Sequence, residues 1–412
     1  MRKARAVSAS VVLVVAVGLS LASVHRGNDF SSAPQGSAPA SPAPGARDPD
    51  SVRPVERSSA AVPRATQRRV GPVSVLDYGA VGDGIRDDTR ALQSALDDAH
   101  PGSPVVLPAG RVFRHTDLLH LRVAGTHVTG RGTLLATRPA RSAVWVDADN
   151  ITIDSITLRA TGVTRRWDAY EQMKLRIAGR SHVTVRNVTV DGSAAAGIFV
   201  GGADHFVLDH VRVKNTRADG IHITAGSRLG RVVSPTVTST GDDAVAVVSY
   251  LGDGALCRDI RVTSPTVRTT NGRGLSVVGG TRITYTDIDV ADTSAAAVYL
   301  ATEGAPYYTH ATTDVSVSGG QVSRANFSES IDHGALVIFN GYRGTMTRLR
   351  ISDLRVEGTR SSATSQASVL TDGAPVTNTT VSGIRFVGGP DVLLRSTLPS
   401  GSGLRSYDLV RN

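Results

Sequence analysis

Three charged residues stand at one position of a short sequence repeat, and with a fourth beside them they could carry out acid–base chemistry. Asp219, Asp243 and Arg273 each stand two residues before an apolar segment, and Asp242 adds a neighbouring carboxylate. If these segments are parallel strands stacked about 4.8 Å apart, the charged side chains form a column. Carboxylates this close repel one another when ionised, so at least one of them should have a raised pKa.

A carboxylic acid beside an ionised carboxylate is what hydrolysis of a glycosidic bond requires. One group protonates the leaving oxygen while the other activates water, and the two lie about 6.5 to 9.5 Å apart in inverting enzymes. A structural alternative stays open, because Asp-Gly turns are common wherever a repetitive β chain reverses direction. Three aspartates in one column favour chemistry, and Arg273 is either a substrate contact or a charge that neutralises them.

The elements that would position this column are short strands in a regular repeat. Three apolar segments recur, as in 198–200, 206–208 and 211–213, and the shortest repeats are 23 or 24 residues long. A period in this range is typical of a solenoid, and three short strands per repeat predict an all-β fold, a single-stranded parallel β-helix with three sheets. The first strands are expected near Val144, Leu175, Ile198, Ile221, Val245, Leu275, Val298, Leu336 and Val369.

One helix is expected at the start of the repeat domain. Residues 87–99 place Leu92, Ala95, Leu96 and Ala99 on one helical face, with Asp87 or Asp88 as the N-cap. A β-helix exposes the edge of its end coil, and a short amphipathic helix would cover that edge. We therefore predict an N-terminal capping helix.

The chain divides into three segments by composition. Residues 1–26 have basic residues followed by an apolar run, which predicts a signal peptide or an uncleaved signal anchor. Residues 27–70 are rich in Ser, Ala, Pro and Arg and predict a disordered linker, and residues 71–412 hold the β-helix. We expect a secreted or extracytoplasmic protein, which contacts a membrane only through a possible N-terminal anchor.

The charge does not favour nucleic-acid binding. Of the formal charge of +9, residues 71–412 carry only +3, with 35 basic and 32 acidic residues. Without a basic stripe or interleaved aromatics we expect no nucleic-acid partner. The single cysteine, Cys257, cannot form an internal disulfide, and we expect a monomer without a cofactor.

The segment 75–89 closely resembles the opening of pectate-lyase-superfamily proteins, notably the polygalacturonase family of glycoside hydrolases. The resemblance implies a right-handed parallel β-helix. It continues through Arg217–Ile221, Gly241–Val247 and Asn271–Val277, which look like the family's Asn-Thr-Asp-Gly, Gly-Asp-Asp and Gly-His-Gly motifs, with arginine in place of the histidine. The family's Arg-Ile-Lys motif falls on Val298–Ala301, where both cations are missing.

This resemblance implies a role for each member of the column. Asp242 would be the general acid, Asp219 and Asp243 would hold the attacking water, and Arg273 would contact substrate. The lost cations, at Tyr299 and Ala301, make polygalacturonate a poor substrate, because its carboxylates need positive partners. We therefore expect a neutral or differently charged glycan.

Two insertions could add substrate contacts on the same side as the column. The candidate contacts are Trp167, Tyr170, Lys174, Tyr299 and Glu303. Aromatic rings there would stack on sugar rings, or they would only pack the loops down.

Three classes of function stay open. The first is an exported polysaccharide-degrading glycoside hydrolase. The second is a polysaccharide lyase, in which Arg273 or Lys174 abstracts a proton and Ca²⁺ at the aspartates neutralises a uronate. The third is a non-catalytic envelope protein that only binds glycan.

Overall fold

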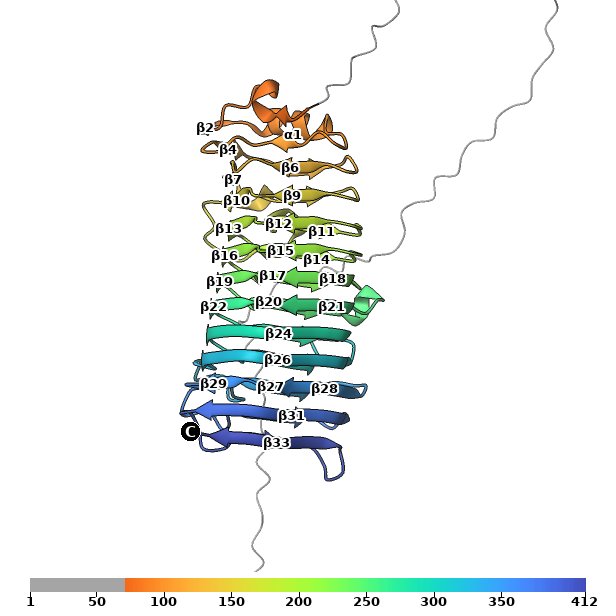
Figure 1. Cartoon of the computed structure of the whole chain (residues 1–412), viewed down its shortest axis with the longest axis vertical. Helices are drawn as coiled ribbons and strands as arrows, with labels where there is room; N and C mark the ends of the chain where they lie inside the picture. Colours follow the sequence, from red (N-terminus) through yellow and green to blue (C-terminus); the bar gives the residue numbers. More distant parts are fainter. Residues whose placement is uncertain (1–70) are drawn as a thin grey trace, which may run out of the picture. The chain divides into compact units, whose positions relative to one another are not determined.

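The computed structural model describes residues 71–412, which wind into coils of short parallel strands stacked in chain order (Figure 1). The predicted signal segment, 1–26, and the predicted linker, 27–70, lie outside the described residues. Most coils contribute three strands, and every pairing between named strands is parallel. The coils therefore form three stacks of strands, which we call the first, second and third sheets.

The first sheet has 11 strands and carries the candidate site. Its strands are β5 (Leu119–Leu121), β8 (Val144–Val146), β11 (Leu175–Ala178), β14 (Ile198–Gly201), β17 (Ile221–Thr224), β20 (Val245–Val248), β23 (Leu275–Val278), β25 (Val298–Thr302), β27 (Leu336–Asn340), β30 (Ala367–Thr371) and β32 (Leu394–Ser396). The expected starts of the first strands are confirmed within two residues, and the sheet extends further at both ends.

The second and third sheets join into one set of 22 strands. The second sheet comprises β1 (Val73–Ser74), β3 (Val105–Val106), β6 (His127–Thr129), β9 (Thr152–Asp154), β12 (Thr184–Arg186), β15 (Val207–Asp209), β18 (Arg228–Val233), β21 (Arg258–Thr263) and β28 (Met346–Ser352). The third comprises β2 (Asp83–Asp87), β4 (Val112–His115), β7 (Thr133–Ala136), β10 (Thr157–Ala160), β13 (Thr189–Ser193), β16 (Arg212–Thr216), β19 (Thr236–Thr240), β22 (Thr266–Thr270) and β29 (Arg355–Glu357). Four long strands run through both sheets: β24 (Gly280–Thr293), β26 (Thr312–Ala325), β31 (Val376–Val387) and β33 (Leu404–Arg411).

The corner between the second and third sheets is a single residue in the left-handed conformation. His210, Ser234, Ser264 and Asp287 have φ between 45° and 54° at equivalent places in successive coils. A one-residue bend changes the strand direction with little interruption of the hydrogen-bonded ladder. For this reason β24 continues across the corner and pairs with both β21 and β22.

The core fills the inside of the coils. Alternate residues of each strand, mostly Val, Ile and Leu, point inward and are almost completely buried, as are Val245 and Val247 in β20. The fold class is therefore confirmed as all-β, a right-handed parallel β-helix with three sheets. Cys257 is a free thiol buried against this core.

The predicted capping helix is α1 (Thr89–Asp97), which lies at the N-terminal end of the stack (Figure 1). Leu92, Ala95 and Leu96 are buried against the first coils. Asp88 is the residue before the helix, but its carboxylate accepts hydrogen bonds from the N–H groups of Val81 and Gly82 and does not cap the helix.

Four short 3-10 turns complete the helical elements of residues 71–412: η1 (Val75–Tyr78), η2 (Pro139–Arg141), η3 (Tyr170–Gln172) and η4 (Leu251–Asp253). Within residues 71–412 no helix has both the length and the apolar character needed to cross a bilayer.

Candidate active site

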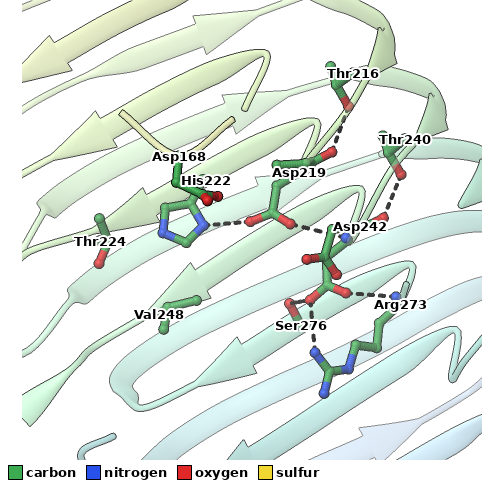
Figure 2. A network of polar contacts seen from close by, with 12 residues as sticks. Asp168, Thr216, Asp219, His222, Thr224, Thr240, Asp242, Val248, Arg273 and Ser276 are labelled. Carbon is green, nitrogen blue, oxygen red and sulfur yellow. Dashed lines mark hydrogen bonds and ion pairs between the residues drawn. The ribbon is translucent and has the colours of Figure 1, made fainter. Parts of the chain in front are cut away.

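The candidate site lies in three successive turns that lead from the third sheet into the first. Asp219 precedes β17, Asp242 and Asp243 precede β20, and Arg273 precedes β23. Ile221, Val245 and Leu275 pair in register across these three strands. This register places Asp219, Asp243 and Arg273 in one column, and Asp242 precedes Asp243 in its turn; Figure 2 shows how Asp219, Asp242 and Arg273 lie.

Each turn has the same shape because a threonine closes it. The hydroxyl groups at the ends of three third-sheet strands donate to the carbonyl two residues further on: Thr216 to Ala218, Thr240 to Asp242 and Thr270 to Gly272. These threonines are buried, so the bonds are shielded from water. The ladder holds the following residues at equivalent positions in all three coils, and it was not singled out from the sequence.

Asp243 is the most enclosed carboxylate of the cluster. Its Oδ1 accepts the backbone N–H of Arg273 at 2.7 Å, and its Oδ2 accepts the hydroxyl of Ser276 at 2.6 Å. Burial raises the pKa of Asp243 to about 7; the charges of Asp242 and Asp219 add to the rise and Arg273 opposes it. Asp243 is therefore held rigidly by donors that favour its ionised form, in surroundings that favour its protonation.

Asp242 is the most accessible of the three carboxylates. Its side chain is 35% exposed, against 13% for Asp219 and 6% for Asp243. Oδ2 accepts from Nη1 of Arg166 at 2.7 Å, whereas no described residue donates a hydrogen bond to Oδ1. Burial and the charge of Asp219 raise the pKa of Asp242, against the ion pair with Arg166. One oxygen is thus free to carry a proton toward a bound molecule.

Asp219 connects the cluster to the face of the first sheet. Its Oδ2 lies 2.5 Å from Nδ1 of His222, and its Oδ1 accepts the backbone N–H of Asp243 at 3.1 Å (Figure 2). Burial opposes protonation of His222, but the hydrogen bond and the charge of Asp219 raise its pKa. His222 was missed in the sequence, although its place at the second position of β17 puts it on the outward face beside Asp219.

Arg273 is anchored on both sides. Its guanidinium lies 4.3 Å from the ring centre of Tyr299 and donates to Oε1 of Glu303 at 3.0 Å, and Nη1 lies 3.7 Å from Oδ2 of Asp243. Tyr299 donates its hydroxyl to the same Glu303 oxygen at 3.0 Å. The expectation that Tyr299 contacts substrate needs correction, because the residue is only 5% exposed and packs against Arg273. Glu303 pairs with Arg273 and is 15% exposed, so its contact with substrate stays a prediction.

Lys174 also needs correction, because it does not reach the surface. The side chain is fully buried, with Nζ 2.8 Å from the carbonyl of Ser142 and 3.2 Å from Nε2 of His115. Strand alternation would place Lys174 on the same outward face as Arg176, but the residue lies in the turn before β11, where its side chain turns inward to these two partners. Lys174 therefore points into the coil, and burial lowers its pKa to about 7.

The two aromatic residues of the first insertion contact different neighbours. Tyr170 packs on Phe199, with ring centres 5.3 Å apart, at the outward face of the first sheet. Trp167 is half-buried beneath Arg165, whose guanidinium lies 3.9 Å from its ring centre. The same insertion supplies Arg166 to the aspartate cluster, a contact across 76 residues of sequence.

Two loops, one around Tyr250 and one around Tyr308, border the aspartate cluster on its C-terminal side. Tyr250 and Thr309 form an isolated bridge, and the N–H of Leu251 donates to the carbonyl of Tyr308. Burial raises the pKa of Tyr250 and the charge of Asp219 adds to the rise; the pKa of Tyr307 is raised by burial and by the charge of Asp242. The phenol groups of Tyr250 and Tyr307 therefore lie close enough to Asp219 and Asp242 for these charges to affect their pKa values. Across the residues described here, no group of three or more His, Cys, Asp or Glu side chains is arranged to hold a metal ion.

Sequence comparisons match the region that holds this site. Residues 72–304 match the family model described as rhamnogalacturonase A/epimerase, pectate lyase-like. A polygalacturonase of Chamaecyparis obtusa is 27% identical over 205 residues, which are 42% of this chain and only 39% of that protein. Mannuronan C5-epimerase AlgE1 of Azotobacter vinelandii is 56% identical over 39 residues, 9% of this chain and 3% of that protein.

Solved structures share the architecture. The catalytic unit of a GH87 α-1,3-glucanase from Streptomyces thermodiastaticus superposes with a TM-score of 0.59 at 20% identity, covering 86% of this chain and 70% of that one. The A-module of Azotobacter vinelandii mannuronan C-5 epimerase AlgE4 superposes with a TM-score of 0.52 at 16% identity, covering 81% and 99%. At these identities the similarity is one of fold.

Proposed function

Because the chain belongs to the rhamnogalacturonase A/epimerase, pectate lyase-like family, we propose that it is a carbohydrate-active enzyme that hydrolyses glycosidic bonds of a polysaccharide. The observation that carries this proposal is the unequal environment of the carboxylates in one column. The pKa values of both Asp242 and Asp243 are raised, but Asp242 is the more exposed and has a free oxygen, whereas Asp243 is enclosed by hydrogen-bond donors that favour its ionised form. Such a difference separates the acid from the base in glycosidases.

The reaction would proceed with inversion. Asp242 donates its proton to the glycosidic oxygen as the bond from that oxygen to the anomeric carbon breaks. Water attacks the opposite face of the same carbon, and its proton passes to Asp219 or Asp243. His222 holds Asp219 in place through the 2.5 Å contact, and Arg273 stays charged beside Asp243.

Elimination is disfavoured by the state of its candidate bases. Burial opposes the charge on Arg273, but Asp243 raises its pKa, so the guanidinium stays protonated and cannot abstract a proton. Lys174 is enclosed in the core. The aspartate oxygens that Ca²⁺ would need are largely engaged by the donors of Arg166, Ser276 and Arg273.

The substrate class follows from the charges around the cluster. Tyr299 and Ala301 stand where the resembling polygalacturonases have cations, so a run of galacturonate across the site would leave carboxylates without partners. We therefore propose a neutral or differently charged polysaccharide. We also propose that the enzyme acts outside the cytoplasm, on the basis of the basic and then apolar sequence of residues 1–26.

A product assay tests this proposal. The purified protein is incubated with a panel of plant and bacterial cell-wall polysaccharides while reducing ends and unsaturated sugars are followed together. We expect reducing ends without unsaturation, lost in Asp242→Asn and kept in Asp209→Asn, a matched change at an exposed corner where the carboxylate of Asp209 contacts His210. Unsaturated ends would indicate a lyase, and binding without turnover, unchanged in Asp242→Asn, would indicate a glycan-binding protein.

A further inference from the structure

A row of side chains leads from the aspartate cluster toward the N-terminal coils along the outward face of the first sheet. Register between β5, β8, β11, β14 and β17 places five residues in this row: His120, Trp145, Arg176, Phe199 and His222. His222 bonds Asp219, so the row begins at the candidate site. Arg176 lies two strands from His222, or about 10 Å along the stack.

Neighbouring side chains of this row contact one another through aromatic rings and through the guanidinium of Arg176. Phe199 stacks on His222 with ring centres 5.8 Å apart and planes 12° from parallel, and Tyr170 lies 5.3 Å from Phe199. The guanidinium of Arg176 lies between two rings, 4.8 Å from the centre of Tyr170 and 4.5 Å from that of Trp145. Flat apolar faces beside a fixed guanidinium are suited to a sugar ring that carries an acid group.

Arg176 differs from the arginines of the cluster because it has no anionic partner. Arg166 and Arg273 each form ion pairs, whereas among the described residues no carboxylate lies within ion-pair distance of Arg176. Its Nε is buried without an acceptor, as is Nε1 of Trp145. The nearby Asp147 is already bound to His120 at 2.6 Å.

The free-energy cost of burying the Arg176 guanidinium without an ion pair indicates that a ligand binds there. Burial lowers the pKa of Arg176, because the charge is partly removed from water without a compensating ion pair. No described residue accepts a hydrogen bond from its terminal nitrogens, so a carboxylate approaching the outward face of the first sheet would meet two unused donors. Guanidinium and carboxylate groups match in a planar, two-bond geometry.

We propose that Arg176, with Trp145 and Tyr170, forms a subsite for the carboxylate of a uronic acid residue in the polysaccharide. This inference rests on the proposed function and narrows its substrate to a polymer that carries an acidic sugar away from the bond that is cut. The cluster itself, with Arg273 engaged by Glu303, receives a sugar that needs no such partner.

Binding without turnover tests the subsite. Asp242→Asn serves as the background, and hexasaccharides of galacturonate, glucuronate, mannuronate and guluronate are each compared with their carboxyl-reduced neutral forms by calorimetry. We expect at least one acidic form to bind about tenfold or more tightly than its neutral form, because a charge-assisted bidentate pair is lost on reduction. Arg176→Met, which keeps the aliphatic stem, should abolish this preference while leaving neutral binding in place.

Two further variants sharpen the result. Arg176→Lys keeps the charge but loses the planar pair, and should recover only part of the preference. Arg186→Met removes a half-exposed arginine that pairs with Asp154 on the second sheet, and should leave the preference unchanged. The subsite would be overturned if each acidic hexasaccharide bound as tightly as its neutral form, or if no acidic form bound. It would also be overturned if the preference for an acidic form persisted in Arg176→Met.

Failure of the subsite and failure of the proposed function are separable. An acidic preference that depends on Arg176, in a protein that cuts no polysaccharide, would keep the subsite and refute the hydrolase. The opposite result is that the active enzyme hydrolyses a polysaccharide without preferring acidic forms, and that its Arg176→Met and Arg186→Met variants have equal rates. That result would keep the hydrolase and refute the subsite.

Discussion

Removing Arg166 should move the pH dependence of hydrolysis in a direction that only a general acid at Asp242 predicts. The two side chains meet at 2.7 Å and are 43% and 35% exposed, so water and salt screen the pair. A pair of this exposure contributes about 0.2 to 1 kcal/mol. Since one pKa unit corresponds to about 1.36 kcal/mol, Arg166→Met should raise the pKa of Asp242 by about half a unit.

The assay is the pH profile of kcat/KM, measured on the substrate that the panel identifies. Loss of the cation favours the protonated acid, so the alkaline limb should move to higher pH by about half a unit while the acid limb moves less. Arg217→Met is the matched control, because Arg217 belongs to the same turn region but donates to the carbonyl of Val163 and pairs with no carboxylate within residues 71–412. An alkaline limb that stays in place or moves to lower pH would refute the role of Asp242 as acid.

Three further changes test other parts of the site. A Cβ at Gly272 would lie 2.5 Å from Oδ1 of Asp243, so Gly272→Ala should lower kcat about tenfold or more, whereas Gly252→Ala, with open space around it, should not. Ser276→Ala removes a hydrogen-bond donor from Asp243. The acid limb of the pH profile should move to higher pH, since the ionised form of Asp243 loses stabilisation. Lys174 has a folded pKa of about 7, below its unfolded value, so stability should rise with pH from about 7 to 10. Lys174→Met should flatten that rise in urea unfolding at pH 7 and 9; an unchanged slope would contradict the buried position.

Much of the fold could be predicted because the same pattern of apolar segments recurs along the sequence. Each coil buries the same alternate positions, so the apolar segments locate the first-sheet strands from Val144 to the coil of Val369. The column of Asp219, Asp243 and Arg273 follows from the same period, since residues at equal distances before paired strands must stack.

The contacts that tune the column were harder to predict. Arg166 reaches Asp242 from an insertion whose path depends on how the loop packs, which no repeat encodes. His222 could have been found, because the alternation of β17 that buries Ile221 places His222 on the outward face. The burial of Lys174 could not have been found in the same way, because alternation would place it outward, and it is the turn before β11 that directs it inward.

The measurement that tests the central claim most directly is proton NMR of the first product formed from the identified polysaccharide, recorded before mutarotation. The account predicts a new reducing end whose anomeric configuration is opposite to that of the linkage cut, because water attacks from the face opposite to Asp242. Retained configuration, or an unsaturated sugar at the new end, would contradict it.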